Sequence, residues 1–164
     1  MDEVRDLVIA RLKGDNPTLY PSLLSGGVYN RKLAVTGAGA TDEAFYVQPN
    51  DLIKRVRLRE SLVIFGPNNV SGTDGAIQTG GIQTRQGYLR MYLYVPATDD
   101  GREHFDQIEA RIFYLLEGWQ AQLSTNYPVT VEHVDTTEPI DSDEFDGALV
   151  GIIRYRAEWS RTAP

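Results

Sequence analysis

The strongest pattern of apolar and polar positions in this chain lies between residues 105 and 119. Large apolar side chains recur there at steps of three and four, the spacing that places residues on one stripe of an α-helix. The stripe consists of Phe105, Ile108, Ile112, Leu115 and Trp119. Just before it, Asp100 and Glu103 have the spacing of a capping box. The pattern predicts a long helix that begins near Asp100 and packs its stripe against the core.

A second helical pattern lies at the start of the sequence. Apolar residues recur there at helical spacing, namely Val4, Leu7, Val8 and Leu12. Asp2 is placed to cap this helix, and Gly14 with Pro17 ends it. Prolines and glycines then interrupt the chain, so we expect only a short helical turn at residues 20–24 and mostly irregular structure as far as Gly39.

Five segments have the composition or the alternation of β-strands. Residues 45–47 and 62–65 are short β-prone runs that end at Pro49 and Gly66. From residue 88 to residue 95, apolar residues alternate with Tyr88, Arg90, Tyr92 and Tyr94. Residues 129–134 form another strand. The last run, 148–159, places Leu149, Gly151, Ile153, Tyr155, Ala157 and Trp159 on one face.

The order of these elements predicts an α+β domain. Strands follow one another or are separated by a single helix, without a repeated βαβ rhythm. We therefore expect an antiparallel or mixed sheet of about four to five strands, with two helices packed on one face. At 164 residues, the chain is long enough for one such domain, spanning residues 1–164, without disulfides or metals.

One segment contradicts the regular pattern. Residues 66–81 read GPNNVSGTDGAIQTGG, with five glycines and almost no side chain that could anchor in a core. We interpret this segment as a long, flexible, exposed loop. Loops of this length are uncommon in compact domains and usually have a function, so the segment is a candidate contact site.

The residue types that carry chemistry are sparse. The chain has no cysteine and two histidines, which no HxxxH or HExxH spacing links, and it has neither a GxSxG elbow nor a phosphate-binding glycine motif. A run of aspartates at 141–146 lacks the spacing of a calcium loop, because Phe145 occupies a ligand position. We therefore expect no enzyme activity, no cofactor and no metal site.

Charge and hydropathy limit the partners. The formal net charge of -7 has the wrong sign for direct nucleic-acid binding. The N-terminal segment has no secretion-signal pattern, and no run approaches the length of a membrane span, so we expect a protein made in the cytoplasm without a membrane partner.

Two charged strips are candidate contacts between subunits. The basic strip consists of Lys54, Arg55, Arg57 and Arg59, and the acidic strip consists of Asp141, Asp143 and Asp146. Opposite charges on neighbouring copies favour association. Two alternatives remain open for the basic strip: a phosphate-binding patch, or a solvated strand edge that its charges protect from aggregation.

Several segments together resemble the tail terminator, or tail completion, proteins of long-tailed bacteriophages. These segments are DLVIARLKG, LLSGGVYNR, YLRMYLYVP, HFDQIEARIFYLLEGW and LVGIIRYRAEW, in this order along most of the chain. The resemblance implies a structural virion protein without catalytic residues or a cofactor. Its subunits would form a hexameric ring that caps the tail tube, ends tube polymerisation and offers a surface for head-tail joining. The implied partners are further copies of the chain, the tail tube protein and the head-tail connector proteins.

The same resemblance makes residues 68–80 the loop that reaches the tube or the ring interior. The candidate contact residues in it are Asn68, Asn69, Ser71, Thr73, Asp74, Gln78 and Thr79. Two other functions stay open: a neck subunit that connects head and tail, and a small non-enzymatic binding module. The binding module would hold a ligand or peptide with the glycine-rich loop and the Tyr88, Tyr92 and Tyr94 face.

Overall fold

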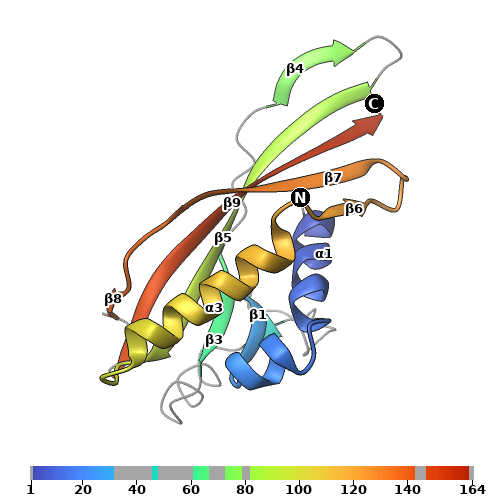
Figure 1. The fold of residues 1–164 in the computed structure, drawn as a ribbon. Helices are drawn as coiled ribbons and strands as arrows, with labels where there is room; N and C mark the ends of the chain where they lie inside the picture. The colour runs from blue at the N-terminus through green and yellow to red at the C-terminus, as the bar shows by residue number, and fades with distance from the viewer. Residues whose placement is uncertain are drawn as a thin grey trace.

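The computed structural model describes residues 2–31, 46–47, 61–66, 73–78, 82–142 and 147–162. Two α-helices, a short π-helical segment and nine strands lie within them (Figure 1). In chain order they are α1 (Asp2–Lys13), η1 (Thr18–Leu23), β1 (Gly27–Arg31), β2 (Tyr46–Val47), β3 (Leu62–Phe65), β4 (Thr73–Gln78), β5 (Ile82–Pro96), α3 (Gly101–Leu116), β6 (Gln120–Gln122), β7 (Pro128–Thr136), β8 (Ile140–Asp141) and β9 (Ala148–Thr162).

The nine strands belong to one mixed sheet. Its main order is β2-β1-β3-β5-β9-β7-β6, with β4 paired to β5 and β8 paired to β9. β1 is parallel to β2 and β3, and every other described pairing is antiparallel. β5 and β9 pair along their whole length, from Ile82 opposite Thr162 to Pro96 opposite Ala148. These two long strands are the axis on which the other elements are arranged.

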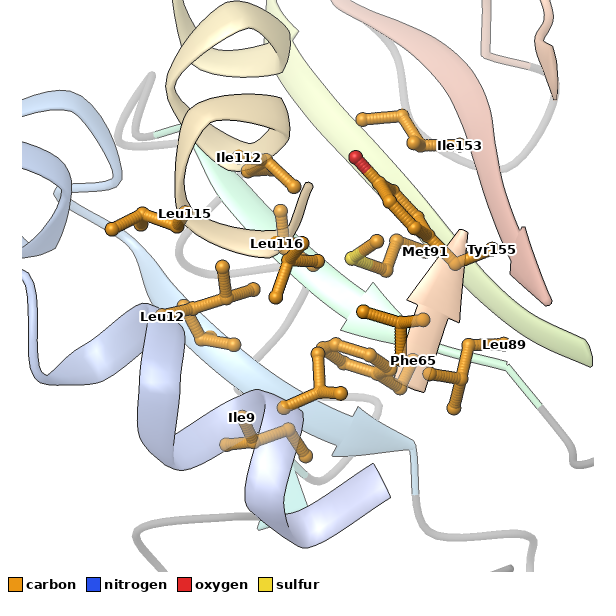
Figure 2. Packing of buried hydrophobic residues seen from close by; sticks show 14 of the residues in the cluster. Ile9, Leu12, Phe65, Leu89, Met91, Ile112, Leu115, Leu116, Ile153 and Tyr155 are labelled. Atoms are coloured by element: carbon orange, nitrogen blue, oxygen red, sulfur yellow. The ribbon is translucent and has the colours of Figure 1, made fainter. Parts of the chain in front are cut away.

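Both helices lie on the same side of the sheet (Figure 1). The apolar stripe of α3 is buried as expected, and its residues Phe105, Ile108, Ile112 and Leu115 join one core cluster with Val4, Val8 and Leu12 of α1. Figure 2 shows Ile112 and Leu116 of α3 on the side of the helix that faces Met91 and Tyr155 of the sheet. Burial stabilises by about 1.5 to 3 kcal/mol for each large apolar side chain, so this stripe drives much of the folding.

The alternation along β5 and β9 decides which residues face the helices. Leu89, Met91, Leu93 and Val95 of β5 are buried in the core, and Gly151, Ile153, Tyr155, Ala157 and Trp159 of β9 are buried on the same face. The predicted inward faces of both strands are therefore confirmed. We call the opposite side of the sheet the outer face. At one end of it, Leu62, Ile64, Tyr94 and Ala148 form a second, smaller buried cluster.

The sheet is larger than the predicted four to five strands. β1 lies in a stretch that we expected to be irregular, and β6 was not expected at all. Both are short and polar in part, so local patterning gives little signal for them. Their backbone groups instead pair with strands elsewhere in the chain, β1 with β3 and β6 with β7. The α+β class, the mixed sheet and the two helices on one face agree with the expectation.

The prediction of a continuous loop at 66–81 is wrong for residues 73–78. These residues form β4, which pairs with the start of β5 across a register shift between Thr73 and Ile77. A glycine inside the strand and the lack of an apolar face hid it in the sequence. Its backbone pairing with β5 defines it as a strand. The neighbouring residues 67–72 and 79–81 lie outside the described part of the chain.

The start and end of α3 differ from the prediction in detail. The Asp100 side chain makes no capping hydrogen bond to the helix, and it accepts one from the Thr98 hydroxyl at 2.6 Å instead. Gly101 begins the helix against the Pro96 carbonyl, where a Cβ atom would approach the oxygen to 2.6 Å. The helix ends at Leu116, and Gly118 turns the chain with φ +71. Trp119 therefore lies beyond the helix, half-buried against the core.

Candidate functional site

Most of the predicted contact residues lie outside the described residues. This group comprises Lys54, Arg55, Arg57, Arg59, Asn68, Asn69, Ser71, Thr79, Asp143 and Asp146. Thr73, Asp74 and Gln78 lie in β4, and Asp141 is exposed in β8. The predicted contact between the basic and acidic strips therefore stays a prediction.

The end of the sheet that carries β4 forms an arm. Figure 1 shows β4, the start of β5 and the end of β9 projecting beyond both helices. Within the arm, Thr73 of β4 lies opposite Arg85 of β5, and Arg85 lies opposite Trp159 of β9. Because paired strands are far stiffer than a free loop, the arm presents its side chains on a fixed frame.

A ladder of ion pairs crosses the outer face between β9 and β7. Arg154 forms a two-point pair with Asp135, in which Nε lies 2.6 Å from Oδ1 and Nη2 bonds to Oδ2. Nη2 of Arg156 lies 2.5 Å from Oε2 of Glu132. On the other flank, the Gln86 amide donates to Glu158 at 3.1 Å. The polar side chains of β9 are thus held by neighbours on both sides.

A β-bulge in β7 makes the Arg154 pair possible. His133 lies opposite Tyr155, but Asp135 lies opposite Arg154, so one extra residue sits between them. This extra residue, Val134, is exposed, and the shift turns Asp135 onto the outer face. The hydrogen bond from Arg154 then lowers the pKa of Asp135. Both partners are more than a third exposed, so the pair orders the surface more than it stabilises the fold.

Two arginines of β5 have no comparable partner. The Nε atoms of Arg85 and Arg90 are buried without a hydrogen bond, and no ion pair is found for either side chain among the described residues. Arg85 lies on the core face of the arm, whereas Arg90 lies on the outer face beside the ion-pair ladder. The sequence pattern indicated that Arg90 lies on the outer face, because Arg90, Arg154 and Arg156 all alternate with the apolar, inward-facing residues of their strands.

The three tyrosines of β5 do not form one open face. Tyr94 is only 4% exposed and belongs to the second buried cluster, against which Tyr92 packs. Tyr88 lies opposite Arg156, near the charged ladder. The expectation of an aromatic surface that includes Tyr94 is therefore wrong. The alternation correctly assigned the tyrosines to one face but could not show that part of this face is covered.

The two histidines have separate, half-buried environments. His104 forms a 2.9 Å hydrogen bond with the Ser61 hydroxyl, and His133 forms one of 2.9 Å with the Thr136 hydroxyl. The His133 ring also meets the edges of Phe113 and Tyr155. The described residues contain no group of three or more side chains arranged to hold a metal ion.

The exposed side of α3 has an aromatic and an acidic region. Phe113 is 43% exposed and Tyr114 is 69% exposed, with the Arg111 guanidinium 4.6 Å from the Tyr114 ring centre. Nearer the start of the helix, burial and the neighbouring Asp106 raise the pKa of Glu109.

Among the described helices, none has the length and apolar character needed to cross a membrane.

The architecture is that of an α+β protein whose long antiparallel strand pair extends past its helical layer. A chain in the solved virion of a native gene transfer agent particle is similar to it, with a TM-score of 0.60 at 14% sequence identity. The similarity covers 94% of this chain and 92% of that chain, so the two share nearly their whole fold. No family model matches the sequence, and no curated protein matches it either.

Proposed function

We propose that this protein is a structural, non-enzymatic subunit of a virion that forms a ring at the end of a tail tube. The observation that carries the proposal is the similarity of fold to a chain of the gene transfer agent virion. This similarity covers 94% of the chain. The order of segments that resembles tail terminator proteins is a second, independent support.

The distribution of side chains supports an assembly role. Two ion pairs shape the outer face, Arg154 with Asp135 and Arg156 with Glu132. The two histidine rings form hydrogen bonds with the hydroxyls of Ser61 and Thr136, and Ser61 is buried. A rigid carrier with a charged face and a projecting arm is suited to contacts between subunits, in which buried area and charge match determine the partner.

In the proposed ring, each subunit repeats the same contact with its neighbour. Head-to-tail contacts close into a ring when the rotation between copies allows it, and six copies are the number that the tail terminator resemblance implies. One side of the ring would meet the tail tube and the other the head connector. A neck subunit would share the ring but not the tube contact, and this difference makes the two roles separable.

The experiment that tests the proposal combines multi-angle light scattering with a tube-capping assay. The purified chain is expected to form a closed oligomer of about six copies, and to bind purified tail tubes at one end in electron micrographs. A chain that stays monomeric at high concentration and does not bind tubes would contradict the proposal. A ring that binds portal-side connector proteins but ignores tubes would instead identify the neck subunit.

A further inference from the structure

Arg90 lies on the outer face, and no acid among the described residues pairs with it. Directly opposite on β9 is Arg154, whose guanidinium is already bound by Asp135. Diagonally opposite is Arg156, which is bound by Glu132. Like charges that face each other across a strand pair are unfavourable, and both acids within reach are used by other arginines. Arg90 therefore remains a half-buried positive charge without a partner among the described residues.

The residue beside Arg90 on the side of β3 is a glycine. Gly66 follows β3 and donates its backbone N–H to the Arg90 carbonyl at 2.8 Å. It has no side chain, and a Cβ at this position would come within 2.7 Å of the Tyr92 ring and 3.6 Å of the Arg90 Cβ. The Tyr92 ring thus lies where a residue larger than glycine would extend. Arg90 therefore lies between Gly66 on one side and Arg154, opposite it on β9, on the other.

An arginine in such a position is suited to a carboxylate from outside the subunit. Its planar guanidinium offers several N–H donors in a fixed geometry that matches a carboxylate. The partial burial means that a bound carboxylate would be screened less by salt than at a fully exposed site. An unpaired, half-buried charge lowers the stability of the fold. A partner that supplies the opposite charge therefore gains more binding free energy here than at an arginine that is already paired.

A second copy of this chain has the complementary surface. The chain has more acidic than basic residues, with a net charge of -7. Four exposed acids gather within eight residues at the start of α3: Asp99, Asp100, Glu103 and Asp106. α3 covers the core face of the sheet, whereas Arg90 lies on the outer face, so the two surfaces of one subunit face different ways (Figure 1). A contact between them joins one copy head to tail with the next.

We propose that the Arg90 guanidinium binds a carboxylate from the acidic start of α3 in a neighbouring copy, and that this contact links the subunits of the ring. The inference rests on the proposed ring-forming function and adds the residues that join its subunits. Arg90 acts as the positive anchor, while Arg154 and Arg156 stay with their own acids and set the shape of the surface around it.

The first experiment compares two matched variants, Arg90→Gln and Arg156→Gln. Both remove one arginine from the outer face, but only Arg90 lacks a partner in its own subunit. Arg90→Gln is expected to raise the concentration needed for half-assembly by about tenfold or more, with an unchanged or higher Tm. Arg156→Gln is expected to change assembly much less. Equal losses in the two variants, or normal assembly of Arg90→Gln, would overturn the proposal.

The second experiment exchanges the charges between copies. Arg90→Glu alone, and Glu103→Arg with Asp106→Arg alone, are each expected to stay unassembled while remaining folded by circular dichroism. When the two proteins are mixed, every contact pairs opposite charges again, so alternating rings are expected to form.

Failure of the mixture to assemble overturns the proposed partner surface. A folded wild-type chain that never forms rings contradicts the ring-forming function itself. A ring of Arg90→Gln that forms normally but no longer caps tubes places the carboxylate on the tube and overturns the subunit contact.

Discussion

The Arg111 guanidinium holds the Asp15 carboxylate with two hydrogen bonds, 2.7 Å from Nε to Oδ2 and 2.8 Å from Nη2 to Oδ1. The two residues are 96 positions apart in the chain. Asp15 follows α1 and Arg111 lies on α3, so the pair connects the two helices at the edge of the core. The Asp15 side chain is only 13% exposed, which makes this ion pair less screened than the ladder on the outer face.

Replacing Asp15 with asparagine is expected to lower the free energy of unfolding by about 1 to 2 kcal/mol at neutral pH. The hydrogen bond from Arg111 is the main reason that the pKa of Asp15 lies below its ordinary value of 3.8. A lowered carboxyl pKa stabilises the fold at pH values above the ordinary pKa, and this contribution is lost as the pH falls through the folded-state value. Denaturant unfolding from pH 7 down to acidic pH measures the effect.

The Asp15→Asn and wild-type stability curves should therefore separate above about pH 4 and converge in stronger acid. The exposed Asp99→Asn variant is a control with the same change of charge, and it is expected to stay within about 0.5 kcal/mol of wild type. A constant difference between Asp15→Asn and wild type down to the lowest pH would show that the charge of Asp15 is not the cause.

Gly151 on β9 and Phe105 on α3 are in contact that leaves no room for a methyl group. A Cβ at Gly151 would lie 2.4 Å from Phe105 Cζ and 3.0 Å from the Thr137 carbonyl oxygen. Gly151→Ala is expected to destabilise the fold by about 1 to 3 kcal/mol, because the ring of Phe105 has to move out of a packed core. Thermal unfolding followed by circular dichroism measures the loss.

A double variant tests this explanation. Phe105→Leu alone leaves part of the core unfilled and lowers stability. In the double variant, Gly151→Ala places a methyl group in part of the vacated space. The double variant should therefore lose less stability than the sum of the two single-variant losses. Simple additivity would mean that the Thr137 carbonyl, rather than the Phe105 ring, causes most of the strain.

Glu109 is expected to reduce stability when it is ionised. Burial and the negative charge of Asp106 raise its pKa, so the folded state binds the proton of Glu109 more tightly than the unfolded state does. The stability contributed by the neutral form is present at low pH, and it is lost as the pH rises through the raised folded-state pKa. Glu109→Gln should therefore increase the Tm by a few degrees at pH 7 and have little effect below pH 4.

Glu103→Gln is the matched control for this prediction. It removes the same charge from an exposed position in the first turn of α3. A negative charge near a helix N-terminus is favourable, so this variant is expected to lose a few tenths of a kcal/mol at pH 7. A gain in Tm for both variants would point to the overall negative charge of the chain rather than to the environment of Glu109.

The contribution of β4 to assembly can be tested without shortening the chain. Phe65 lies opposite Met91, so Gly66 lies beside Arg90. Between Arg90 and Ile82, β5 extends over about 27 Å at about 3.4 Å for each residue, and the chain from Gly66 to Ile82 has to cover this distance. A deletion of residues 71–79 would leave too few residues to cover this distance and would detach the start of β5. Replacing residues 73–78 with a glycine-serine sequence of equal length removes the strand but keeps the reach.

This replacement is expected to preserve the Tm within about 1 to 2 °C, because the core residues lie elsewhere, and to abolish tube capping in the electron-microscopy assay. A control that replaces the three exposed residues 124–126, in the turn between β6 and β7, with glycine and serine should cap tubes normally. Capping at the wild-type level by the β4 replacement would show that the arm does not contact the tube. A folding defect would show that β4 contributes to the core sheet.

The sequence by itself determined the parts of the fold that depend on local periodicity. The stripe from Phe105 to Leu115 and the alternation along residues 88–95 and 148–159 each repeat often enough to define an element and its buried face. The absence of cysteine and the presence of only two histidines likewise favour a surface function over catalysis. These conclusions need only the residue types and their order.

Tertiary structure alone decided the rest, because it depends on which distant residues become neighbours. β1, β4 and β6 exist through backbone pairing with other strands, a contribution that the side-chain pattern does not record. The bulge at Val134 shifts Asp135 into contact with Arg154, whereas no acid partner is found for Arg90 among the described residues. Charge pairing across a sheet depends on register, and register is set by the whole set of paired strands.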